Sequence, residues 1–260
     1  MELNLTGKTA LITGASKGIG YAVAETLAAE GCNLHLAARN GEAMAALKAE
    51  LEGKYDVSVT IHPADLGSAE AMIALDKAAG DYDILINNAG DIPAGPLEEV
   101  ADEELRRGFE LKVFGYITLS RLFWQKRKGK SDSVIINVIG NSGENWDASY
   151  FAGSTGNASL MSFTKAIGGR SMDEGIRVVG VNPGPVDTDR MFKIMKRKAI
   201  DMLGDESRWE ELYAKYPGGR PATAQEVADL CAFLASPKAG YISGTVVTID
   251  GGIAARGSVI

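Results

Sequence analysis

The chain has 260 residues, of which 45% are hydrophobic, and a formal net charge of −7 at pH 7; it is long enough for a sizeable buried core and too acidic to favour nucleic-acid binding. The two cysteines, Cys32 and Cys231, lie far apart without a C-x-x-C spacing, so they predict neither a disulfide framework nor a metal site. The amino terminus lacks a secretion signal and no segment reaches about 18 apolar residues, so we expect a cytoplasmic protein that does not span a membrane.

Short apolar runs recur along the chain between helical patterns. They cover residues 9–13, 33–38, 57–62, 83–88, 133–138, 176–182 and 245–250. Most are apolar nearly throughout, as expected of parallel strands buried on both faces. Among the helical patterns, Asn40 is placed to cap a helix over 42–51, and Gly53 to end it.

This alternation predicts an α/β fold, with a single Rossmann-type, doubly wound parallel sheet of about seven strands and helices on both faces. No repeat, linker or low-complexity tract marks a boundary, so we expect one domain over residues 1–260. The segment 189–216 is expected to be a substrate lid within that domain.

A glycine-rich loop follows the first strand-like run. In T-G-A-S-K-G-I-G, Gly14, Gly18 and Gly20 open a helical stretch. Glycine permits a tight turn, so that the amino terminus of the helix can present amide donors to a pyrophosphate. Because a strand precedes the loop and a helix and a second strand follow it, the loop predicts a dinucleotide site and not merely a glycine turn.

Five motifs together resemble the short-chain dehydrogenase/reductase family over nearly the full chain. They are the loop spacing G-x-x-x-G-x-G, N-N-A-G at 87–90, N-P-G-P-V-D-T at 182–188, G-R-P-A-T-A-Q-E-V-A-D at 219–229, and Y-I-S-G followed by D-G-G at 250–252. The resemblance implies an oxidoreductase that transfers a hydride between NAD(P)(H) and a small alcohol or carbonyl compound. It also implies a homo-tetramer or homodimer built on helices near 105–125 and 153–170.

Carried over residue by residue, the resemblance implies a complete dinucleotide site. The glycine loop would line the phosphates and the adenosine ribose with Gly14, Ser16, Lys17, Gly18, Ile19 and Gly20. Asp65 and Leu66 would flank the adenine, Asn88, Ala89 and Gly90 would form the floor of the cleft, and Pro183, Gly184, Val186 and Thr188 would hold the nicotinamide carboxamide. Taken singly, each of these residues could also be an ordinary turn or cap residue.

The residues after the second strand indicate which coenzyme the site prefers. An acidic residue there would accept hydrogen bonds from the ribose 2'-hydroxyl and repel a 2'-phosphate, but this chain has Ala38 followed by Arg39. Arg39 and Lys17 offer a cationic clamp that suits a phosphate, which predicts NADP, with NAD still possible. The alternative is that both are surface cations without a ligand.

The residues that usually carry the family's chemistry are missing from their aligned positions. In most members a Tyr transfers the proton, a Lys four residues on holds the nicotinamide ribose, a Ser orients the carbonyl, and an Asn completes a proton relay. Here the tyrosine position falls on Gly153, the lysine position on Asn157, the serine position on Gly140 and the asparagine position on Lys112.

Two observations nevertheless favour a relocated catalytic set. Lys112 and Asn157 have exchanged the residue types usual at the two positions, so a cation and an amide would still meet. Tyr150 and Ser142 supply hydroxyl groups close to the altered positions. We therefore expect Tyr150 or Ser142 to contact the substrate oxygen, Lys112 to supply positive charge and Asn157 to bind the nicotinamide ribose. The alternative is that Tyr150 is an aromatic wall of a loop.

Three functions stay open at this point. The first is an atypical NADP(H)-dependent oxidoreductase acting on a small molecule. The second is a non-catalytic NAD(P)-binding sensor or partner subunit. The third is a non-redox enzyme on the same fold, such as a lyase or dehalogenase, which the complete dinucleotide site disfavours.

Overall fold

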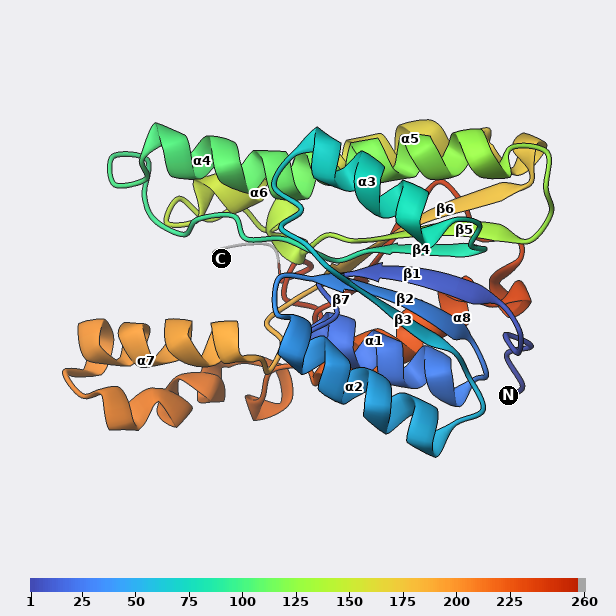
Figure 1. Cartoon of the computed structure of the whole chain (residues 1–260). Coiled ribbons are helices and arrows are strands. Elements are labelled where there is room, and N and C mark those ends of the chain that lie inside the picture. The colour runs from blue at the N-terminus through green and yellow to red at the C-terminus, as the bar shows by residue number, and fades with distance from the viewer. Residues whose placement is uncertain (257–260) are drawn as a thin grey trace.

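The computed structural model describes residues 1–256, except for the side chains of residues 190, 193 and 201, which belong to the expected lid. Seven parallel strands form one sheet in the order β3-β2-β1-β4-β5-β6-β7, with helices on both faces (Figure 1). The strands are β1 Thr9–Thr13, β2 Asn33–Ala38, β3 Val59–Pro63, β4 Ile84–Asn87, β5 Ser133–Val138, β6 Ile176–Pro183 and β7 Thr245–Ile249. The predicted α/β fold class is confirmed.

The strand order reverses at β1. The chain runs outward from β1 through β2 to β3, then returns to place β4 on the other side of β1. In doubly wound sheets, ligands bind at such a reversal, beyond the carboxyl ends of the strands. The topology therefore directs attention to the loops that follow β1, β2 and β4.

Two helical layers cover the sheet and bury its faces. Figure 1 shows α1 (Gly18–Ala29), α2 (Gly41–Lys54) and α8 (Ala224–Ala235) below the sheet, and α3 (Ala69–Ala79), α4 (Asp102–Phe109), α5 (Gly115–Arg127) and α6 (Phe151–Gly168) above it. The lower helices share one core with Ile12, Leu34 and Leu36, and α3 and α5 share another with Leu11 and Leu85. Both faces of the sheet are thus apolar at its central strands β1, β4, β5 and β6, which explains why these strands are continuous hydrophobic runs in the sequence.

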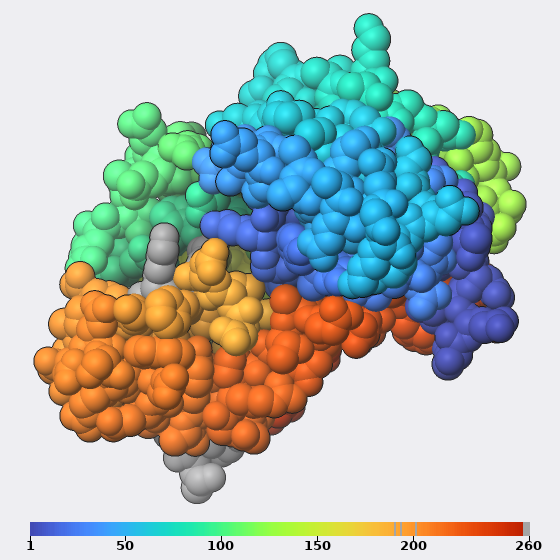
Figure 2. All heavy atoms as spheres, turned by 60° about the horizontal axis from the view of Figure 1, so that its bottom comes forward, coloured from blue at the N-terminus to red at the C-terminus, as the bar shows by residue number. Residues whose placement is uncertain are grey.

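Two elements lie outside these layers. Helix α7 (Asp189–Leu203) and the 3₁₀ segment η4 (Glu206–Lys215) pack on each other and project beyond the sheet (Figure 1). In the space-filling view of Figure 2 they form the orange lobe at the lower left. They coincide with the segment expected from the sequence to be a lid.

The helix expected near 105–125 contains a π-helical turn. Helix α4 continues into η1 (Glu110–Phe114), which continues into α5. A π turn inserts one extra residue, so the side chains after it point in a different direction, and such turns are frequent at functional sites. Lys112 lies within this turn.

Helix α2 agrees with the sequence at its start and differs at its end. The side chain of Asn40 accepts a hydrogen bond from the Ala43 N–H at 3.1 Å, which confirms the predicted N-cap. Gly53 does not end the helix, which continues to Lys54. A helical glycine is tolerated there because the backbone hydrogen bonds continue, with the Tyr55 N–H donating to Leu51 O at 2.9 Å.

A chain of buried polar side chains crosses the sheet beneath the carboxyl ends of its strands. Asn87 on β4 donates through Nδ2 to Asn137 Oδ1 on β5 at 2.9 Å and to Ser120 Oγ at 3.2 Å. Asn137 in turn donates to Thr164 Oγ1 on α6 at 2.9 Å. These bonds join β4, β5, α5 and α6 to one another.

The described residues offer neither a membrane span nor a cluster of metal ligands. None of the helices in residues 1–256 is both long and apolar enough to cross a bilayer. The same part of the chain contains no group of three or more His, Cys, Asp and Glu side chains placed to hold a metal ion. Cys32 and Cys231 are both buried as free thiols.

Candidate active site

The glycine loop is shaped by close backbone approaches. Gly14 and Gly18 have φ angles of +70° and +57°, which favour glycine. A Cβ at Gly20 would lie 2.3 Å from Gly14 O, and one at Gly14 would lie 2.9 Å from Asn88 Nδ2. Any side chain at Gly20 would therefore collide with the backbone of the loop.

The helix that follows the loop begins without a side-chain cap. Side chains of Asn40, Ser68, Thr188 and Thr223 cap α2, α3, α7 and α8, whereas α4 and α6 lack a side-chain cap. No described side chain caps α1 at Lys17 either. Its first amides and the positive end of its dipole can therefore serve an anionic ligand. Ser16 is half-buried and Lys17 exposed beside it, while Ile19 packs against the core. These features fit a pyrophosphate.

The end of β4 is tied to the glycine loop. Asn88 Nδ2 donates to the backbone oxygens of Thr13 and Gly14 at 3.0 and 3.3 Å. The backbone N–H groups of Asn88 and Ala89 both donate to Thr13 Oγ1, at 3.0 and 3.1 Å. The structure thus brings the predicted floor of the cleft, residues 88–90, against the predicted phosphate loop.

The predicted adenine side of the site follows β2 and β3. Arg39 comes directly after β2, and its Nη2 lies 3.8 Å from Asp91 Oδ2. Leu66 is buried, while Asp65 is exposed and accepts a hydrogen bond from the backbone two residues on. Strand β2 ends in Ala38, so the acidic residue that would bind a ribose 2'-hydroxyl at this position is absent.

The predicted nicotinamide side consists of Pro183, which ends β6, and the three residues Gly184, Val186 and Thr188. A Cβ at Gly18 would lie 3.2 Å from the Thr188 methyl carbon, so this segment abuts the glycine loop. The Thr188 hydroxyl accepts a hydrogen bond from the Met191 N–H at 3.4 Å and donates to Val186 O at 3.3 Å. Sequence reasoning missed this use of the hydroxyl as the cap of α7.

Tyr150 lies over Gly153. A Cβ at Gly153 would be 2.0 Å from ring atom Cε1 of Tyr150 and 2.1 Å from Cζ. The phenol ring therefore fills the space where a side chain at position 153 would begin. Tyr150 precedes α6, and its backbone pairs with Gly95, which holds the residue at the start of the helix.

Asn157 and Ser142 form a pair next to Gly140. Asn157 is 3% exposed and donates through Nδ2 to Ser142 Oγ at 2.7 Å. A Cβ at Gly140, whose φ is +128°, would lie 2.9 Å from the same Nδ2. The other amide atom, Oδ1, is buried without a partner among the described residues. It is also shielded from solvent, so a ligand could reach it only after the side chain turns.

Lys112 reaches the same segment from the other side. Its Nζ donates to Ile139 O at 2.5 Å, and a Cβ at Gly90 would lie 2.9 Å from its Cδ. The ammonium of Lys112 and the amide of Asn157 thus both lie against the Ile139–Gly140 segment. The structure brings together the cation and the amide that the sequence places on separate helices.

The turn that carries Ser142 is anchored to β7 by contacts that the sequence does not predict. Asn141 Nδ2 donates to Asp250 Oδ2 at 3.2 Å, and Thr248 Oγ1 donates to Glu144 Oε2 at 3.1 Å. Burial raises the pKa of the Asp250 carboxyl, but hydrogen bonds from Asn141 and the backbone that follows hold it below its usual value.

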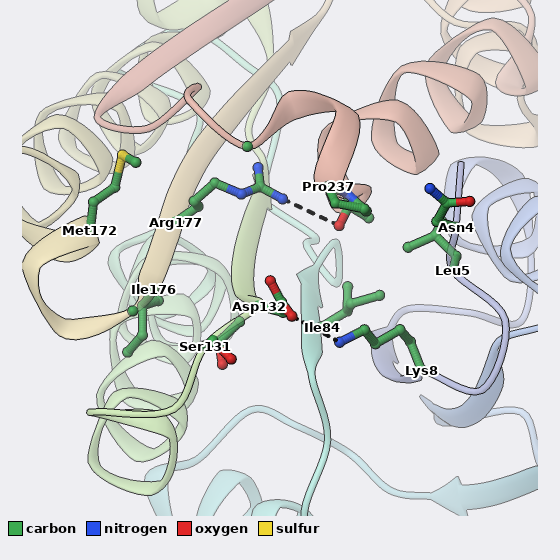
Figure 3. Close-up of a pocket in the computed structure, with 14 residues that line it drawn as sticks. Asn4, Leu5, Lys8, Ile84, Ser131, Asp132, Met172, Ile176, Arg177 and Pro237 are labelled. Atoms are coloured by element: carbon green, nitrogen blue, oxygen red, sulfur yellow. Dashed lines mark hydrogen bonds and ion pairs between the residues drawn. The ribbon is translucent and has the colours of Figure 1, made fainter. Parts of the chain in front are cut away.

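A separate cavity of about 380 Å³ lies at the amino ends of the strands (Figure 3). Lys8, Ile84 and Arg177, at or just before the starts of β1, β4 and β6, are among its lining residues. The Arg177 guanidinium donates to three backbone oxygens of residues 234–236 at the end of α8, at 2.7 to 3.2 Å. The Arg177 guanidinium thus stabilises the end of α8. The cavity lies at the amino ends of the strands, whereas Tyr150 lies beyond their carboxyl ends.

Comparisons with known proteins show the family to which the chain is related. A family profile described as enoyl-(acyl carrier protein) reductase matches residues 14–254. The 3-oxoacyl-[acyl-carrier-protein] reductase FabG of Escherichia coli K12 is 35% identical over 256 residues, which cover 96% of this chain and 99% of the relative. Sorbitol dehydrogenase of Cereibacter sphaeroides is 31% identical, covering 96% of this chain and 98% of its own.

Solved structures give the same result. L-sorbose reductase from Gluconobacter frateurii, complexed with NADPH and L-sorbose, superposes with a TM-score of 0.91 at 30% identity and covers 98% of this chain and 99% of its own. The resemblance in fold thus extends over nearly the whole of both molecules. The chain belongs to the short-chain dehydrogenase/reductase family of NAD(P)-dependent oxidoreductases.

Proposed function

We propose that the protein interconverts a small carbonyl compound and its alcohol with NADP(H), and that Tyr150 serves as its acid/base group. The observation that supports this most is the Tyr150 ring within 2.1 Å of a Cβ at Gly153. Position 153 aligns with the family's usual tyrosine, so a phenol from position 150 occupies the space where that side chain would start. The usual tyrosine, lysine, serine and asparagine would then be replaced by a relocated set.

The dinucleotide would be held by the residues around the strand reversal. The uncapped amino terminus of α1 would bind the pyrophosphate, and Arg39 with Lys17 would face the 2'-phosphate. Asn157 would bind a ribose hydroxyl after its side chain turns, because its unpartnered Oδ1 is shielded from solvent. When bound, NADP(H) donates or accepts the hydride, and that chemistry belongs to the coenzyme.

The chain itself would supply the proton. The Tyr150 phenol would protonate the carbonyl oxygen during reduction and accept the proton back during oxidation. Lys112, held by Ile139 O, would place a positive charge near the substrate oxygen. Ser142, held by Asn157 at 2.7 Å, would donate a second hydrogen bond to the same oxygen.

The expected size of these contributions is limited. A positioned acid or base contributes roughly 10²- to 10⁴-fold, or about 3 to 5 kcal/mol. Proximity of the nicotinamide and the carbonyl supplies several kcal/mol more without any proton transfer by the protein. Loss of Tyr150 would therefore slow turnover strongly without abolishing it.

Two further parts of the proposal concern assembly and access. Helix α7 and η4, joined by an edge-on contact between Phe192 and Trp209 at 4.8 Å, would form the substrate lid. The helices α4, α5 and α6 would form the interface of a homo-tetramer or homodimer. Phe114, which is 52% exposed between α4 and α5, would be covered there.

The test begins with a screen of carbonyl compounds and alcohols, followed by the absorbance of the reduced nicotinamide. With a substrate in hand, Tyr150→Phe, Ser142→Ala and Lys112→Met are compared with the parent protein at equal cofactor saturation. We expect a loss of about 10²-fold or more in kcat/KM for Lys112→Met and for at least one hydroxyl variant. Tyr241→Phe is the matched control, because Tyr241 is 94% exposed just before β7, at the opposite edge of the sheet.

Two results would contradict the proposal in different ways. Full activity in all three variants would reject the relocated acid/base set and leave water or a substrate group as the proton source. Stoichiometric NADPH binding without turnover of any substrate would instead support a non-catalytic NAD(P)-binding sensor or partner subunit. What favours that second function is that none of the four aligned positions has the residue type usual in the family. These positions are Gly140, Gly153, Asn157 and Lys112.

A further inference from the structure

An ion pair joins the loops that follow β2 and β4. Arg39 comes one residue after the end of β2, and Asp91 comes four residues after the end of β4. Arg39 Nη2 and Asp91 Oδ2 are 3.8 Å apart. The two residues are 52 positions apart in sequence, so only the fold brings their charges together.

The Arg39–Asp91 pair lies where the strand order of the sheet reverses. Strand β1 lies between β2 and β4, and neighbouring strands are about 4.8 Å apart, so the loops that carry Arg39 and Asp91 leave the sheet about 10 Å apart, on either side of the carboxyl end of β1. The glycine loop starts at that end, and the strand order reverses there. The Arg39–Asp91 pair therefore lies across the crevice in which a dinucleotide binds in this type of sheet.

The backbone at Asp91 is fixed from two sides. On one side, Asn88 and Ala89 are hydrogen-bonded to Thr13 at the end of β1. On the other, a Cβ at Gly108 of α4 would lie 3.2 Å from Asp91 O, so the chain packs closely against that helix. The backbone of Asp91 therefore stays beside the crevice when the Arg39 side chain turns away.

We infer that Asp91 is an internal competitor for Arg39, and that it weakens NADPH binding relative to NADH binding. In the free protein the carboxylate forms a loose ion pair with the guanidinium, 3.8 Å away. A 2'-phosphate must displace that carboxylate and then meets its negative charge nearby. NADH carries a neutral 2'-hydroxyl there, so it does not need to displace the carboxylate and is repelled less by its charge. This inference rests on the proposed NADP(H) site.

The competition is weak enough to be overcome in normal binding. Both side chains are about 60% exposed, with values of 59% for Arg39 and 61% for Asp91. Exposed pairs of this kind are screened by solvent and salt, and their loss changes an equilibrium by roughly two- to fivefold. Asp91 therefore lowers the affinity for NADPH relative to NADH, but NADPH remains the tighter ligand.

The experiment measures dissociation constants of NADPH and NADH by calorimetry for the parent protein and Asp91→Asn. We expect Asp91→Asn to bind NADPH about two- to fivefold more tightly, with a change of less than about twofold for NADH. The gain should shrink as the salt concentration rises. Asp56→Asn is the matched control, because it removes the same charge from an exposed residue just before β3, at the opposite edge of the sheet.

A second background separates competition from long-range repulsion. In an Arg39→Ala protein, Asp91→Asn should improve NADPH binding by a smaller factor than in the parent, because no guanidinium is left to release. An equal gain in both backgrounds, or no gain in the parent, would overturn the inference. If the parent does not bind NADPH at all, the proposed function fails instead, so the two failures are distinguishable.

Discussion

Replacing Gly153 with alanine adds one methyl group where the ring of Tyr150 now lies. The nearest ring atoms would be 2.0 and 2.1 Å from the new carbon. Comfortable carbon contacts are about 3.5 Å or longer, so the ring must move by about 1.5 Å. A displacement of that size removes the phenol from the position that the proposed proton transfer requires.

Two opposing terms set the effect on stability. Overpacking costs about 1–3 kcal/mol, whereas alanine in a helix is more stable than glycine by about 0.5–1 kcal/mol. We therefore expect Gly153→Ala to lower the free energy of unfolding modestly. Its effect on kcat/KM should be larger, about 10²-fold, because misplacing a reacting group by about 1 Å has consequences of that order.

A double-mutant cycle with Tyr150→Ala gives the decisive measurement. Urea unfolding of the parent, both single variants and the double variant yields the interaction free energy between the two positions, which we expect to be about 1–3 kcal/mol. Without the Tyr150 ring, the added methyl should be neutral or stabilising. If Gly153→Ala destabilised the protein equally with and without the Tyr150 ring, the ring would not occupy this space, and the main support for Tyr150 as the acid/base group would be lost.

Arg39→Asp should make NADH the tighter ligand, because an acidic side chain repels the 2'-phosphate; equal calorimetric dissociation constants for both coenzymes in the parent would contradict this. His35 Nδ1 and His62 Nε2 are 2.9 Å apart, and burial lowers the pKa of both rings. The unfolded chain therefore binds protons more readily, and the free energy of unfolding should fall as the pH drops below about 6.5, less steeply when both residues are replaced by Asn. Arg127→Met removes a buried guanidinium and should lower the free energy of unfolding by about 3 kcal/mol, measured with denaturant. Arg208→Met removes a surface guanidinium and should lower it by less; equal losses in the two variants would refute this ranking.

The sheet and the glycine loop could be predicted because they depend on local sequence. Continuous apolar runs specify strands buried on both faces, and the carboxyl end of β1 is followed directly by Gly14 and its neighbours. The N-cap at Asn40 was equally local, since its partner is three residues away. The predicted end of the same helix at Gly53 was wrong, because one glycine does not stop a helix whose backbone hydrogen bonds continue beyond it.

The contacts that shape the candidate site could not be read from the sequence. Asn141 and Asp250 are 109 residues apart, and their hydrogen bond exists only because β7 lies at the edge of the sheet beside β6. The direction of Lys112 depends on a π turn, which no residue pattern announces. The Tyr150 ring lies over Gly153 because of the backbone angles at the start of α6, and these are set by packing.

The buried chain of Asn87, Asn137 and Thr164 has a consequence for how the protein folds. Asn87 and Asn137 are register partners on adjacent parallel strands, and both have 0% exposure. A slip of β5 by one residue would turn Asn137 to the other face and leave buried amides unpaired, at a cost of about 1–3 kcal/mol for each group. Apolar strands tolerate such slips more easily, because one isoleucine or valine replaces another. These amides therefore select the correct alignment of β4 with β5 while the sheet assembles, and with it the alignment of the loops that carry Asn88 and Gly140.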